Sequence, residues 1–219
     1  MRLNRKQIVE FIEEKIIAGY LSGDEIVTAT AQEYIEDAQD KHAARARGVI
    51  EKLVVTAITE KITTEHRWLG LTDCDRLNLA FVELNRRGIV ACQNLGCCND
   101  CAHTDILKIA DRRAADAATV CGYAFFHQRD VERVVRTGEL NVSFNAYSSG
   151  SQNTDDKNYS IETNITRARA IAAIIVNVLR AHGLKASWSG SYLQRITISE
   201  MNWERRQFTF APDAIAAIA

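Results

Sequence analysis

The chain has 219 residues, of which 47% are hydrophobic and 25% are charged, and its formal net charge is −1. This is the balance of an ordinary globular protein, and it excludes an intrinsically disordered chain. The small net charge gives no general attraction to nucleic acid or to an anionic membrane, and no apolar run reaches the roughly 18 residues of a membrane span.

The N-terminal stretch "MRLNRKQIVEFIEEK" mixes charged residues with spaced apolar ones. It lacks the continuous apolar segment of a secretory signal. We therefore expect a cytoplasmic protein, whose thiols are kept reduced. In that compartment the six cysteines indicate metal binding, catalysis or packing, and they argue against a disulfide framework.

The first third of the chain has the pattern of a helical subdomain, which we place at residues 1–70. Ile8, Ile12 and Ile16 repeat at helical spacing. Ser22 followed by Glu25 forms the signature of a capping box at the start of a second helix. A third helix is predicted to begin near Lys41. These apolar stripes predict core contacts between helices and carry no chemistry.

From Thr72 the pattern changes to alternating helices and strands, which predicts an α+β domain over residues 71–219. A helix after Thr72 and another from Asn99 alternate with strands. The predicted strands are 89–93, 121–127 and 139–147, and a long helix then precedes an antiparallel hairpin formed by 184–190 and 194–200. We expect a mixed sheet of about five strands layered with helices. The strand order stays open.

One loop in this region is rich in Ser, Asn and Asp, from Ser148 to Lys157. Such a composition is typical of turns and loops, and it makes this segment the best candidate for a mobile one.

The stretch "CQNLGCCNDCAH", from Cys92 to His103, holds four of the six cysteines. Zn²⁺ prefers four thiolate or imidazole ligands in a tetrahedron, and Cys-x-x-Cys is its usual two-ligand unit. Cys98 and Cys101 have this spacing, and Cys97 is adjacent. His127, at the end of a predicted strand, could complete the set if that strand lies beside 89–93, with His103 as a substitute. A zinc site, structural in role, is the leading hypothesis.

Reactive thiol chemistry is a second interpretation of the cluster. Cys98 would lie at the start of the helix from Asn99, where unpaired backbone N–H groups favour a thiolate. His127 could act as its base, oriented by Asp130 or Asp105. Asp100 works against this interpretation, because a neighbouring negative charge disfavours the thiolate.

Packing is a third interpretation, because free cysteine is among the most buried residue types. It suits Cys74, near a helix start, and Cys121, at the entry to an apolar strand. Packing stays open for the cluster itself as well, although packing alone rarely needs three cysteines as close together as those from Cys97 to Cys101.

The segment from Thr72 to Asp130 resembles a bacterial family known as domain of unknown function 6891. The resemblance extends over nearly the whole chain, and it is carried by an Asp-Cys-Asp-Arg-Leu helix start, an Asn before a Cys-Cys-x-x-Cys cluster, and a Gly-Tyr-x-Phe-x-His strand. The matching positions are Asp73, Cys74, Asp75, Arg76, Asn94, Cys97, Cys98, Cys101, Gly122, Tyr123, His127 and Asp130. Leu95, Ala102 and Cys92 depart from the pattern, so we expect no role for the Cys92 sulfur. The resemblance implies no particular activity.

Two other classes of function remain open beside a zinc protein. The helices before Thr72 could dock a protein partner or a second copy of the chain, as a non-enzymatic interaction module. A thiol-dependent enzyme or redox protein is the third hypothesis. No phosphate loop or dinucleotide-binding fingerprint is present in the sequence.

Overall fold

The computed structural model describes residues 5–35, 41–116, 118–148 and 161–206. The chain divides into two compact units, one formed by Met1–Thr72 with Glu204–Ala219 and the other by Asp73–Trp203. Of the predicted mobile loop, Ser148 to Lys157, all residues after Ser148 lie outside the described part of the chain.

The first unit is built from the helices α1 (Arg5–Ala18), α2 (Gly23–Tyr34) and α3 (Lys41–Glu65). The predicted stripe of Ile8, Ile12 and Ile16 is buried in its core. The predicted capping box is present, since Ser22 Oγ accepts from the Glu25 N–H and Glu25 accepts from the Ser22 N–H at 2.8 Å. Arg205, which belongs to the C-terminal part of this unit, donates to the Gly19 carbonyl at 3.0 Å.

The second unit confirms the predicted fold class, an α+β arrangement with a mixed sheet. Its helices are α4 (Asp73–Arg86), α5 (Asn99–Ala115), α6 (Gln128–Thr137) and α7 (Ile161–Ala181). Its strands are β1 (Ile89–Cys92), β2 (Gly122–Phe125), β3 (Leu140–Ala146), β4 (Lys185–Ser187) and β5 (Ile196–Ser199). The order is β1-β2-β3-β5-β4, with β1 and β2 parallel and the other neighbours antiparallel. β4 and β5 form the predicted antiparallel pair.

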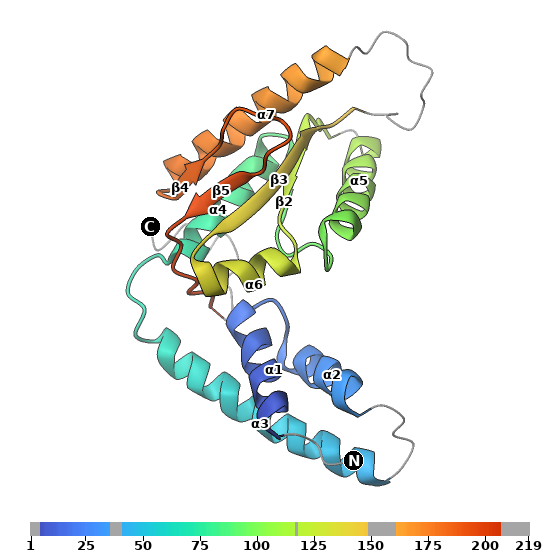
Figure 1. The fold of residues 1–219 in the computed structure, drawn as a ribbon, viewed down its shortest axis with the longest axis vertical. Coiled ribbons are helices and arrows are strands. Elements are labelled where there is room, and N and C mark those ends of the chain that lie inside the picture. Colours follow the sequence, from blue (N-terminus) through green and yellow to red (C-terminus); the bar gives the residue numbers. More distant parts are fainter. Residues whose placement is uncertain (1–4, 36–40, 117, 149–160, 207–219) are drawn as a thin grey trace. The chain divides into compact units, whose positions relative to one another are not determined.

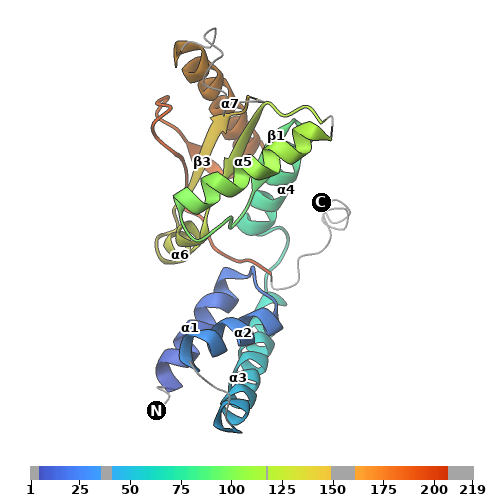
Figure 2. The ribbon, with the colours of Figure 1, turned by 90° about the vertical axis from the view of Figure 1, so that its right-hand side faces the viewer.

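Helices cover both faces of this sheet. α4 and α7 pack on one face, while α5 packs against β1 and β2 on the other (Figures 1 and 2). A Cβ atom at Gly122 would lie 2.8 Å from the Ile171 side chain, so the close approach of α7 to β2 requires glycine there. Tyr123 and Phe125 belong to the cluster that α5 covers, together with Ile106.

The alternation along β3 leaves a polar strip on the α5 side of the sheet. Leu140 and Val142 are fully buried. Asn141, Ser143 and Asn145 alternate with them and remain partly or fully exposed. The sheet therefore presents hydrogen-bonding groups beside α5.

The described helices include none with the length and apolar character that crossing a membrane requires.

Candidate metal centre

The loop from β1 to α5 is attached to the turn between β2 and α6. Leu95 donates its N–H to the Phe126 carbonyl at 2.9 Å, and Gln128 donates its N–H to the Gly96 carbonyl at 3.1 Å. Because β1 and β2 are parallel neighbours, both connections leave the sheet at the same edge. The cysteine loop and the start of α6 are therefore held together.

Gly96 allows this loop to lie tightly against the first turn of α5. Its φ is +65°, in the left-handed region that favours glycine. A Cβ atom there would lie 3.0 Å from the Ala102 nitrogen and 3.2 Å from the Cys101 Cβ. The turn at Gly96 brings the sulfur of Cys97 close to that of Cys101, which lies in the first turn of α5.

The structure brings three of the predicted ligands together. The sulfurs of Cys97, Cys98 and Cys101 all lie within 4.8 Å of one another, and those of Cys97 and Cys101 are 3.7 Å apart. Cys97 and Cys101 are exposed and Cys98 is partly buried. The packing interpretation is therefore wrong for Cys97 and Cys101, whereas Cys74 is buried as that interpretation predicts. A cluster of three sulfurs that could hold a metal ion is present.

The position of the cluster at a helix N-terminus affects its protonation. The Cys101 N–H in the first turn of α5, followed by the thiols of Cys101 and Cys97, lowers the pKa of Cys98. The Cys97 and Cys98 sulfurs favour the protonated form of their neighbour and raise the pKa of Cys101 to about 11. Three adjacent thiols resist full ionisation without a cation, since each new charge repels the others.

His127, the predicted fourth ligand, begins α6 as its N-cap residue. Asp130 accepts the His127 N–H at 3.0 Å, and the same carboxylate oxygen lies 3.2 Å from Nδ1 of the buried imidazole, without hydrogen-bond geometry. Burial lowers the pKa of His127, and the nearby Arg195 adds to this effect against the opposing Asp130. The balance of these effects favours the neutral imidazole. It does not belong to the group of converging sulfurs.

His103, the predicted substitute, has its Nε2 atom 2.9 Å from the hydroxyl oxygen of Tyr123. It also stands outside the sulfur group. For the thiol interpretation, Asp130 is the carboxylate that reaches His127, whereas Asp105 pairs with Lys108 at 3.1 Å. Among the described residues, no hydrogen bond joins the Cys98 sulfur to the His127 imidazole, and that interpretation stays a prediction.

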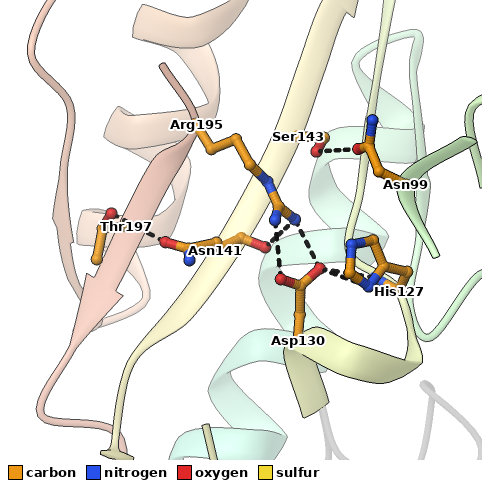
Figure 3. Close-up of polar contacts among 7 residues, drawn as sticks. All are labelled: Asn99, His127, Asp130, Asn141, Ser143, Arg195 and Thr197. Carbon is orange, nitrogen blue, oxygen red and sulfur yellow. Dashed lines mark hydrogen bonds and ion pairs between the residues drawn. The ribbon is translucent and has the colours of Figure 1, made fainter. Parts of the chain in front are cut away.

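Arg195 was not singled out in the sequence, yet it organises the surroundings of His127 (Figure 3). Its guanidinium donates to both oxygens of the buried Asp130, at 2.8 and 2.6 Å, and to the Asn141 carbonyl at 2.7 Å. A bidentate arginine–carboxylate pair of this kind is strong and directional. Arg195 thereby links the β4–β5 hairpin to the beginning of α6.

A match with a known family covers almost the whole chain. The family described as "Domain of unknown function (DUF6891)" matches residues 2–207. The chain belongs to this family. No curated protein matches the chain, and no solved structure matches it. The sulfur cluster of this DUF6891 chain lies within the matched region. Its own geometry is therefore the evidence for its role.

Substituting Gly96 tests whether the tight loop needs glycine. Gly96→Ala introduces backbone strain of about 1–2 kcal/mol and a contact with the first turn of α5, which adds about 1–3 kcal/mol. Gly190→Ala is the matched control, because Gly190 has φ +86° but a Cβ atom added there would meet no other atom within 4 Å. Denaturant unfolding should show a larger loss in the free energy of unfolding for Gly96→Ala than for Gly190→Ala. Equal losses would show that the close approach of the loop to α5 has no energetic consequence.

Removing the Arg195 guanidinium tests the ion pair that holds the start of α6. Arg195→Ala leaves the buried carboxylate of Asp130 without its main partner, and we expect a loss of about 3–5 kcal/mol in the free energy of unfolding. Arg133→Ala, which breaks the exposed pair with Glu139, is the control and should cost about 0.2–1 kcal/mol. Similar losses in the free energy of unfolding for the two variants, measured by denaturant unfolding, would contradict the assignment of Arg195 as the residue that holds the start of α6.

Proposed function

We propose that the protein binds Zn²⁺ through the thiolates of Cys97, Cys98 and Cys101. The convergence of the three sulfurs carries this proposal. Tetrahedral zinc with Zn–S bonds of about 2.3 Å separates its sulfurs by about 3.8 Å. The Cys97 and Cys101 sulfurs are already 3.7 Å apart, and all three lie within 4.8 Å of one another. Small side-chain rotations would therefore complete a trigonal set of ligands.

The chemistry of the donors favours zinc over harder ions. Thiolates select Zn²⁺, Cu⁺ and iron–sulfur clusters, whereas Mg²⁺ and Ca²⁺ prefer oxygen. A divalent cation would also neutralise charges that the three adjacent thiols cannot carry alone. Because the ligands come from the end of the β1–α5 loop and from the first turn of α5, the bound ion would cross-link these segments. The role is thus structural, as the sequence hypothesis has it.

The fourth position of the ion faces outward in this proposal, since Cys97 and Cys101 are exposed. A closed structural site would need a fourth protein ligand there, since an open position filled by water is typical of catalytic zinc. His127 stays a prediction as the fourth ligand. Its Nδ1 atom lies 3.2 Å from a carboxylate oxygen of Asp130, and the imidazole would have to turn away from this carboxylate to bind the ion. Partner docking through the helices before Thr72 likewise stays a prediction, and no contact among the described residues favours it over zinc binding.

Metal analysis of the purified protein tests this function. Protein prepared without chelator or added metal should carry about one zinc ion per chain, as expected for a single tetrahedral site. Cys97→Ser and Cys101→Ser should each reduce the zinc content severely, because a hydroxyl is a poor replacement for a thiolate ligand. Inductively coupled plasma mass spectrometry, referred to the protein concentration, gives the measurement.

Cys121→Ser is the control for this experiment. Cys121 lies outside the cluster, with its sulfur 3.3 Å from the Gly88 carbonyl, so its replacement should leave the zinc content unchanged. Wild-type protein with little zinc, and with all three cluster thiols open to a thiol reagent under native conditions, would contradict the proposal. His127→Gln in the same series shows whether the imidazole is a ligand.

A further inference from the structure

A pocket of about 450 Å³ opens on the α5 side of the sheet. This volume lies within the range of about 300–1,000 Å³ that is typical of small-molecule sites. One wall comes from the start of α5, where Asn99 follows Cys98 directly, and the floor comes from β2 and β3. The segment that leads into β5, which contains Tyr192 and Arg195, forms the opposite wall.

Two kinds of side chain dominate the lining. Three of the lining residues, Asn99, Asn145 and Gln194, carry carboxamides, which combine donors with an acceptor. The Asn99 Oδ1 already accepts from the Ser143 hydroxyl at 3.3 Å and the Asn145 Oδ1 from the Ala146 N–H at 2.8 Å, so each of these oxygens keeps one lone pair for a ligand. Aromatic rings accompany them, among which Tyr123 and Phe125 are stacked with centroids 6.4 Å apart. Flat apolar surfaces combined with paired donors and acceptors suit a planar ring whose edge carries both kinds of hydrogen-bonding group.

The charges around the pocket do not favour an anion. Its guanidinium, on Arg195, is already bound by both oxygens of Asp130 and by the Asn141 carbonyl. None of the described lining residues is acidic, so the pocket does not favour a cation either. A neutral ligand fits this balance best.

The rim of the pocket carries exposed apolar side chains. Tyr192 is 42% exposed and Leu193 is 77% exposed, although both stand beside a polar pocket. Large exposed apolar residues grouped at the edge of a pocket are typical of a surface that a ligand covers. Because Tyr123 and Phe125 are almost fully buried, the aromatic surface of the pocket that is open to a ligand is that of Tyr192 at this rim.

We infer that this pocket binds a neutral, planar heteroaromatic ligand of the nucleobase or nucleoside class, held against the exposed ring of Tyr192 and recognised at its edge by the carboxamides of Asn99, Asn145 and Gln194. Such binding does not require zinc, because the cysteines of the cluster are not among the lining residues. In the sequence, His103 stands out as a possible metal ligand and Tyr123 as a position of the family pattern, but no local signal places them in one pocket.

Saturation-transfer difference NMR on the full chain tests this inference, with adenosine, guanosine, cytidine and uridine as probes at millimolar concentration. At least one nucleoside should show transfer to its ring protons. Asn145→Leu and Tyr192→Ala should each weaken its binding about tenfold or more, as expected for the loss of an edge contact or of a stacking partner. Leu69→Ala, at an exposed residue of the other unit, is the control and should leave binding unchanged.

Three results would overturn the inference. They are the absence of transfer for all four nucleosides, binding that both pocket variants retain in full, and transfer to the acetate methyl protons in place of the nucleosides. Circular dichroism of each variant verifies that a loss of binding does not reflect unfolding. In the Cys97→Ser/Cys101→Ser protein, nucleoside binding should persist while zinc is lost, so the two proposals fail separately.

Discussion

Two backbone hydrogen bonds between the β1–α5 loop and the β2–α6 turn hold the loop that carries the sulfur cluster against the start of α6. The N–H of Leu95 binds the Phe126 carbonyl, and the N–H of Gln128 binds the Gly96 carbonyl. Backbone bonds of this kind fix positions independently of side-chain rotamers. They place the sulfur cluster beside the start of α6, at the edge where two parallel strands end, a common position for ligands in sheets with parallel strands.

Features set by local pattern could be predicted from the sequence. The alternation of Leu140 and Val142 with polar residues shows which face of β3 is buried. The capping box at Ser22 indicates the start of α2. The spacing of Cys97, Cys98 and Cys101 likewise predicts the cluster, because ligands within one loop and one helical turn converge whenever the helix begins at Asn99.

Features that depend on segments distant in the sequence could not be predicted. The placement of β5 between β3 and β4 depends on tertiary pairing, which the hairpin pattern alone leaves open. Arg195 reaches Asp130 across 65 positions, and no local signal announces this pair. The same contact explains the position of the His127 imidazole. Asp130, three residues after His127, suits a helix cap, and its buried ion pair with Arg195 holds the carboxylate beside the imidazole.

The coordination shell of zinc added to the protein tests the proposed metal site most directly. Zinc K-edge X-ray absorption of the zinc-loaded protein should show a shell of about three sulfur atoms at about 2.3 Å and one lighter ligand. That result would mean that the sulfurs from the loop and from the first turn of α5 converge on one ion. A shell dominated by nitrogen and oxygen, with one sulfur or none, would contradict it.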